Sequence, residues 1–377
     1  MSSVLLTLFS ELPDPRRNQG KMYPLPPILL FTVLAMLAGA RSYRQVHAFI
    51  RTHQDRLNSA FGLSLRRAPA YSSVRFILRG LDAAEVERAF RTHAAGLVDN
   101  GLADVPADGE SIPAAVAIDG KTLRGSFDAF HDRKAAHLLS AFAADGQIIL
   151  GHLAIAEKSN EIPAAQEMIA TLGLTGRLFT LDAMHCQKNV EIARETGNHL
   201  LVQLKANQAK LFDAVCVIAD TTTPDDTAIA HNTGRSRQES RTVEVFPAGD
   251  VLAATEWQPF VKTIVRVTRR TWLRSAATGL WDQRGEVAFY LSSATDLPAT
   301  AWAAAIRGHW GIENRNHYVR DVSCDEDKCR IRDNPGIMAR ARSFALNILR
   351  TNRVANVAKA LWDGALSLDH ILAYKKI

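Results

Sequence analysis

The spacing of hydrophobic and polar residues changes near residue 114. Before that point, apolar residues recur at intervals of three and four, as at Val46, Phe49, Ile50 and Leu57. We therefore expect residues 1–105 to form an all-helical domain. Residues 103–113 hold two prolines, one glycine and three acids, a composition typical of a linker. The predicted helices cover residues 24–44, 45–58, 72–81 and 83–100.

Residues 114–212 contain short apolar runs that predict strands. Asp145 and Gly146 separate two of these runs and favour a tight hairpin turn. The predicted order is three antiparallel strands, helix, strand, helix and strand. This order is that of a ribonuclease H-like α/β fold, in which helices cover a mixed sheet. The predicted strands cover residues 114–118, 138–142, 148–155, 178–181 and 200–204, and the helices 161–172 and 187–196.

The rest of the chain divides into three predicted segments. Residues 213–299 largely lose the helical spacing and contain β-type runs, which predicts a β-rich insertion. Helical spacing returns over residues 301–320 and 337–352. We therefore expect a catalytic core made of residues 114–212 and 300–350, followed by a C-terminal tail over residues 351–377.

Composition narrows the class of protein. The longest apolar run, residues 28–40, has 13 residues, whereas a membrane span needs about 20. Residues 1–17 lack a basic leader, and four cysteines in 377 residues are too few for a disulfide framework. We therefore expect a reduced cytoplasmic protein with no membrane partner.

The net positive charge of the chain lies in its first 100 residues. Residues 1–100 hold 13 basic and 7 acidic side chains, while residues 101–377 hold 32 of each. Such an excess is typical of a module that binds a polyanion, although a solvated basic surface without a partner would have the same composition. Arginines recur through several predicted helices, as expected of one assembled face that contacts DNA phosphates, with Arg41 and Arg44 as candidate contacts.

Three carboxylates lie at informative places. Asp119 and Asp182 each follow a strongly apolar predicted strand, and Glu313 lies on the predicted helix 301–320. Singly they could be a turn residue, a helix N-cap and a surface acid. Together they can converge at one edge of a sheet, where hard oxygen ligands suit Mg²⁺, with Mn²⁺ as a substitute. Asp321 is the main competitor of Glu313 for the third position.

Several polar residues near the ends of predicted strands are candidate DNA contacts. Surface lysines usually have no specific partner, so these assignments are weaker than the three carboxylates. Cys324 and Cys329 are spaced one residue further apart than in a usual zinc knuckle, which disfavours zinc. The candidates are Lys121, Arg124, Lys158, Asn160, Lys205 and Asn207.

The chain resembles the DDE transposases of bacterial insertion sequences, of the ISAs type that includes the H-repeat-associated proteins. The resemblance implies a helical domain associated with the transposase, a ribonuclease H-like core, and Asp119, Asp182 and Glu313 as a metal-binding triad. Residues 316–318, Asn-His-Tyr, depart from the usual Leu-His-Trp of relatives. The resemblance is carried by residues 14–17, 20–24, 118–126, 157–162, 182–187, 204–208 and 307–314.

The expected function is cleavage of the 3′ ends of an insertion sequence and their transfer into target DNA. Two divalent ions would activate first water and then the freed 3′ hydroxyl, with Asp119 bridging both ions and Asp182 and Glu313 each holding one. The expected DNA partners are the double-stranded terminal inverted repeats of the element and the target DNA, which would associate the protein with the nucleoid while it is bound. The expected protein partners are further copies of the chain, in a homodimer or higher multimer. Two alternatives remain open: a nuclease of the same fold, and a decayed transposase that only binds DNA.

Overall fold

The computed structural model describes residues 3–18, 21–98, 113–155, 161–182, 186–205, 208–249, 252 and 257–377. The chain forms two compact units. The first contains residues 1–105, 120–164 and 311–377, and the second contains residues 106–119 and 165–310. Over the described ranges, no helix combines the length and the hydrophobicity that crossing a membrane requires.

The first unit begins with a helical region. The helix predicted over residues 24–44 ends at Leu37, because Gly39 adopts a left-handed backbone with φ of 77°. Ser42 then begins the next helix by accepting a hydrogen bond from the backbone N of Gln45 at 3.3 Å. A short helix at the start was not predicted. The helices are α1 (Val4–Ser10), α2 (Leu25–Leu37), α3 (Tyr43–Phe61), α4 (Tyr71–Arg79) and α5 (Ala83–Val98).

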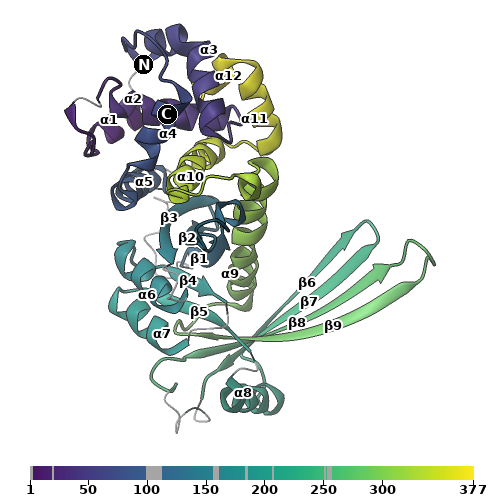
Figure 1. Ribbon diagram of the computed structural model, residues 1–377. Coiled ribbons are helices and arrows are strands. Elements are labelled where there is room, and N and C mark those ends of the chain that lie inside the picture. The colour runs from purple at the N-terminus through teal and green to yellow at the C-terminus, as the bar shows by residue number, and fades with distance from the viewer. Residues whose placement is uncertain are drawn as a thin grey trace. The chain divides into compact units, whose positions relative to one another are not determined.

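The helical region shares its core with later parts of the first unit. α10 (Pro335–Thr351) packs against α2, α5 and β3 (Figure 1). The ring centroids of Phe9 and Phe90 lie 5.4 and 5.0 Å from that of Phe344 on α10. The predicted tail contains α11 (Val357–Leu366) and α12 (Leu368–Leu372), and α11 packs against α2. Residues before the predicted linker therefore fold together with residues after it.

The described strands form one nine-stranded mixed sheet in the order β3-β2-β1-β4-β5-β9-β8-β7-β6. β2 and β3 are antiparallel, β1, β4 and β5 are parallel, and the strands from β5 to β6 in this order are antiparallel. The mixed α/β class with an N-terminal helical region is confirmed. The strands are β1 (Ala115–Thr122), β2 (His137–Ala143), β3 (Ile148–Ile155), β4 (Leu178–Leu181), β5 (His199–Leu204), β6 (Asp226–Gly234), β7 (Arg237–Pro247), β8 (Thr263–Arg274) and β9 (Trp281–Ser292).

The remaining helices are α6 (Glu161–Thr171), α7 (Cys186–Glu195), α8 (Ala209–Thr221) and α9 (Ala299–Gly311). α8 covers the start of the segment that was predicted to be β-rich from residue 213. Its buried residues Leu211, Val215, Ile218 and Ala219 have the spacing of a helix face, so the pattern was present in the sequence. In the second unit, Trp302 of α9 is fully buried against Val243, Val265 and Val267. Figure 1 shows β6 to β9 continuing well beyond α9.

Candidate catalytic site

Asp119 and Asp182 belong to the second unit, on neighbouring parallel strands. β1 and β4 pair with Ala115 opposite Leu178 and Ala117 opposite Thr180. The pairing extends to Ala117 and Thr180, and Asp119 and Asp182 each follow two residues later along the chain. Adjacent strands lie about 4.8 Å apart, and residues at the same level point to the same face. β1 was predicted to end before Asp119, but it continues to Thr122 because β2 pairs with it.

Lys205 forms an ion pair with Asp182. Its Nζ lies 2.7 Å from Oδ1 and 2.9 Å from Oδ2 of Asp182. Both side chains are about half exposed, at 48% and 55%. Lys205 was predicted to contact a DNA phosphate; in the structure its ammonium group bridges both carboxylate oxygens, as a metal ion would. Contact of Lys205 with DNA stays a prediction.

Gly120, directly after Asp119, lies against a histidine and a glutamate. His137 Nε2 and Glu161 Oε1 are 2.8 Å apart, and each side chain is about one-third exposed. A Cβ atom on Gly120 would overlap the ends of both side chains, which would then have to move aside. Neither residue was among the predicted site residues. Glu161 does lie within the block 157–162 that carries the family resemblance, which was the available signal.

Glu313 belongs to the first unit, and its convergence with the two aspartates stays a prediction. It lies in a π-helical segment, Ile312–His317, that follows α9 and precedes a second one at Val319–Ser323. π-Helical turns are rare and occur frequently at functional sites. The α-helical spacing predicted over residues 301–320 would set Glu313 and His317 on one face. Glu313 is exposed and His317 is buried, so these two side chains do not share one buried face.

Lys121 follows Asp119 by two residues but is held by carboxylates. The Lys121 side chain is 6% exposed, and its ammonium group pairs with Asp321 and, at 3.7 Å, with Asp327. Burial raises the pKa of the Asp321 carboxyl, while the hydrogen bond from Lys121 acts in the opposite direction. Asp321, the competitor of Glu313, is therefore committed to Lys121. A DNA contact by Lys121 stays a prediction.

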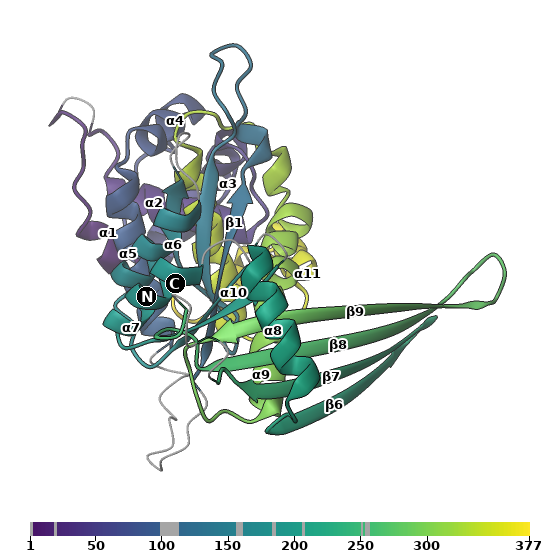
Figure 2. The ribbon, with the colours of Figure 1, turned by 90° about the horizontal axis from the view of Figure 1, so that it is seen from below.

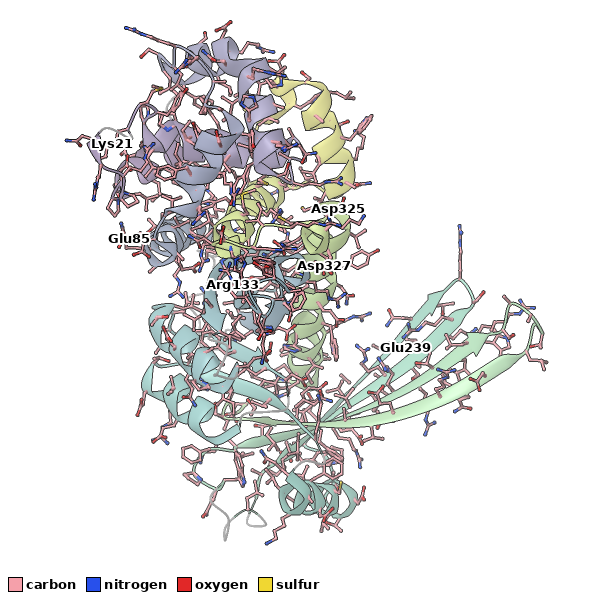
Figure 3. All side chains as sticks on the ribbon, in the orientation of Figure 1. Lys21, Glu85, Arg133, Glu239, Asp325 and Asp327 are labelled. Carbon is pink, nitrogen blue, oxygen red and sulfur yellow. The ribbon has the colours of Figure 1, made fainter. Side chains whose placement is uncertain are left out.

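Arg124 and Gly125 follow Asp119 in the block 118–126 that carries the family resemblance. Arg124 is exposed, with its guanidinium 3.5 Å from Asp327. Gly125 lies directly against the backbone of Asp327 and Cys329, where a Cβ atom would clash. Figure 3 labels Asp325 and Asp327. The glycine therefore allows residues 124–126 and 326–328 to pack closely.

Arg41 and Arg44 lie on the surface of the helical region. Arg41 is half exposed and pairs with Asp325. The Arg44 guanidinium lies over the ring of Tyr71, 5.1 Å from its centroid. Both stay predicted DNA contacts. Lys158, Asn160 and Asn207 lie outside the described residues.

The donor atoms of the two aspartates fit a divalent cation. Both supply hard carboxylate oxygens, and Asp182 already accepts a cationic ammonium group on both of its oxygens. Within the described ranges, no group of three or more His, Cys, Asp and Glu side chains is arranged to hold a metal ion. Asp119, Asp182 and Glu313 therefore all stay predicted metal ligands.

Comparison with known families identifies the class of protein. Residues 6–94 match the DDE_Tnp_1-associated family, and residues 110–348 match the family described as Transposase DDE domain. The second match spans more than half of the chain. The chain therefore belongs to the DDE transposases and functions as a DNA transposase of insertion-sequence type.

Individual relatives agree with this assignment. The chain is 30% identical over 378 residues to YhhI of Escherichia coli (strain K12), an H repeat-associated protein named as a candidate transposase, covering 97% of this chain and 96% of YhhI. It is 32% identical over 358 residues to YncI of Escherichia coli O157:H7, also named as a candidate transposase, covering 92% of this chain and 87% of YncI. The cryo-EM structure of piggyBac transposase in a synaptic complex with hairpin DNA aligns over 97% of this chain and 78% of its own, with 11% identity and a TM-score of 0.41.

Proposed function

We propose that this DDE transposase cuts the 3′ ends of its element and joins them to target DNA at a site formed by Asp119, Asp182 and Glu313. The residues would hold two Mg²⁺ ions, with Mn²⁺ as a substitute. The substrates are double-stranded terminal inverted repeats and target DNA, and the active form is a homodimer or higher multimer on DNA. The proposed core, residues 114–212 and 300–350, is of the ribonuclease H-like type.

The observation that carries this proposal is the register of β1 and β4. Extending the pairing of Ala117 with Thr180 by two residues along both strands would bring Asp119 beside Asp182 on one face of the sheet. Two carboxylates at that separation would repel each other, so a cation between or beside them stabilises the arrangement. Lys205 supplies one such positive charge to Asp182.

The position of α9 supports Glu313 as the third ligand. His309 in the last turn of α9 has its Nδ1 2.9 Å from Oγ1 of Thr180, two residues before Asp182. Glu313 follows His309 by four residues along the chain. Asp321 is eight residues further on and is already paired with Lys121.

The chain's own residues position the reacting groups. When bound, the divalent ions supply Lewis acidity that lowers the pKa of the attacking oxygen and neutralises charge on the leaving one. Asp119 and Asp182 would fix the ions on rigid, adjacent strands, and His137 with Glu161 would hold the backbone at Gly120. Lys205 would be displaced from Asp182 on metal binding, leaving its ammonium group free to contact a DNA phosphate.

The triad is tested by substituting each acid with its amide. We expect Asp119→Asn, Asp182→Asn and Glu313→Gln to lower Mg²⁺-dependent cleavage at least about a thousandfold, equivalent to about 4 kcal/mol of barrier, with DNA binding retained. Asp321→Asn is the matched control and should retain part of the cleavage activity. The opposite ranking of Glu313→Gln and Asp321→Asn would move the third ligand to Asp321.

A strand-joining assay with a pre-cut element end separates transposition from simple cleavage. The wild-type chain should join the 3′ end to a target duplex in Mg²⁺. Cleavage without joining would instead indicate a nuclease of the same fold, and DNA binding without cleavage would indicate a decayed transposase.

A further inference from the structure

The connection between β1 and β2 forms a braced hairpin, defined here as residues 123–136. Leu123 donates its backbone N–H to the carbonyl of Ala136 at 2.8 Å, and Asp128 and Arg133 exchange backbone hydrogen bonds of 3.1 and 3.0 Å. Ser126 Oγ accepts a hydrogen bond from the N–H of Ala136 at 2.8 Å. Figure 2 shows this hairpin projecting beyond the end of β1. Its tip therefore has a defined conformation.

Asp128 braces the tip from within. The Asp128 side chain is only 5% exposed, and its carboxylate contacts His131 Nδ1 at 2.8 Å and the backbone N–H of Phe130 at 3.3 Å. Around this brace, Phe127 is 54% exposed and Phe130 is 88% exposed. Single exposed apolar residues are common on protein surfaces. Two phenylalanines presented by a braced turn are a different feature, because the fold holds them out of any core of the described chain.

Four arginines from three parts of the first unit lie in this hairpin or near the carboxylates that its residues contact. Arg75 and Arg79 of α4 and Arg133 of the hairpin each lie 3.5 Å from the carboxylate of Asp333. Arg332 lies 3.6 Å from Asp128. All four side chains are about half exposed (Figure 3 labels Arg133).

The contacts of these arginines leave donors available. Charge-assisted hydrogen bonds of arginine are normally about 2.7–2.9 Å long, and these contacts are longer. Four guanidinium groups share the carboxylates of Asp128 and Asp333, so the surface has an excess of positive charge. Phe76 on α4 is 65% exposed and adds a third aromatic ring to the first unit's surface, one residue after Arg75.

We propose that the hairpin 123–136, with Arg75 and Arg79 of α4 and Arg332, binds duplex DNA at the element end and inserts Phe130 between base pairs. The arginines neutralise phosphates, and an apolar side chain beside them is the kind of wedge that unstacks a base step. An apolar protein partner would leave the four arginines buried without matching charge, whereas DNA satisfies both features. This inference rests on the proposed action of the chain on DNA ends.

The arginine contacts are tested with the full chain and a fluorescein-labelled duplex taken from the DNA that borders the coding sequence. We expect the double variant Arg75→Gln/Arg133→Gln to bind about tenfold more weakly at physiological salt. The slope of log K against log salt concentration should fall by about 1.8, since each phosphate contact contributes about 0.9. The matched control is Arg88→Gln/Lys359→Gln, which removes two exposed, ion-paired cations elsewhere in the first unit. Equal affinities and slopes for the two double variants would overturn the proposal.

The wedge is tested with 2-aminopurine, whose fluorescence rises when the base is unstacked, placed at successive positions of the same duplex. Wild-type chain should raise the signal at one position, and Phe130→Ala should abolish the rise while still binding. The matched control is Trp362→Ala, which removes another exposed aromatic side chain, on α11 at 66% exposure, and should keep the rise. A rise that survives Phe130→Ala, or no rise with wild type, would overturn the wedge.

Metal-dependent cleavage by the wild-type chain is measured in parallel. If the wild-type chain cleaves DNA normally and the arginine variant binds DNA as tightly as wild type, the proposed DNA-binding surface is wrong and the proposed function stands. If the wild-type chain does not cleave DNA but its binding depends on the arginines, the proposed function is wrong and the DNA-binding surface stands.

Discussion

Asp182 and Lys205 show what a single residue's sequence position conveys and what it omits. Sequence placed Lys205 at the end of a strand and predicted a phosphate contact. Its pairing with Asp182 depends on the register of β4 and β5, in which Leu181 lies opposite Val202. The next step of that register sets Asp182 opposite Gln203, two residues before Lys205 on the same face. The register is fixed by packing of the whole sheet, so the local sequence could not reveal it.

Asn316 is a polar residue buried in the π-helical segment Ile312–His317. It is fully buried, and within the described structure neither atom of its side-chain amide has a hydrogen-bond partner. An unsatisfied buried polar group costs about 1–3 kcal/mol. We expect Asn316→Leu, of similar volume, to raise the free energy of unfolding by about that amount, measured by urea denaturation. Asn314→Leu at an exposed position is the control, and an equal or larger gain there would contradict the explanation.

At the scale of elements, strongly patterned segments were predicted correctly and weakly patterned ones were not. The apolar strand Leu178–Leu181 and the helix Cys186–Glu195 were found close to their predicted positions. β6 falls within the segment predicted to be β-rich, but its residues are almost all exposed, so no alternation of buried positions marks where this strand begins and ends. The π-helical turn at Glu313 was missed because its residues satisfy the spacing of an α-helix equally well.

α5, β3 and α10 are joined by one buried ionic network. Glu87 of α5 accepts hydrogen bonds from the backbone N–H of His152 at 2.6 Å and from Nε of Arg340 at 2.7 Å. Burial alone would raise the pKa of Glu87, but His152 and Arg340 outweigh it and lower the pKa to about 2. The carboxylate is thus ionised and tightly held.

Removing that charge should loosen the contact among the three elements. We expect Glu87→Gln to lower the free energy of unfolding by about 3 kcal/mol, because Arg340 is left as a buried cation with a weaker partner. Glu85→Gln, on the exposed side of the same helix beside Arg88, should change it by less than about 1 kcal/mol. Urea denaturation followed by circular dichroism compares the two, and equal losses would show that the network adds nothing specific.

At the scale of the whole molecule, the helical region is part of a larger folding unit. The sequence indicated a basic module separated by a linker at residues 103–113, and the excess of positive charge in residues 1–100 is consistent with a role in DNA affinity. The shared core of Phe9, Phe90 and Phe344 could not be inferred, because it joins the first quarter of the chain to its last. Truncation before the linker would expose this core, so substitution of single surface residues is the sounder test of DNA affinity.

The same unit contains two buried histidines whose titration makes its stability depend on pH. His93 is 4% exposed and His152 is fully buried. Burial lowers the pKa of each from the ordinary value of 6.5 to about 4. As pH falls below 6.5, the unfolded chain binds protons that the folded chain does not, so stability present above 6.5 is lost progressively towards pH 4. Glu87 adds a further loss only below its ordinary value of 4.5.

We therefore expect the free energy of unfolding to fall by about 2 kcal/mol per histidine between about pH 7 and pH 5. The measurement is urea denaturation of the full chain at both pH values. In His93→Gln and His152→Gln the difference between the two pH values should shrink, whatever each substitution costs at neutral pH. Replacing the exposed His370 with Gln should leave the difference intact. If the double variant His93→Gln/His152→Gln keeps the full wild-type difference in free energy of unfolding between the two pH values, other groups control the acid response of this unit.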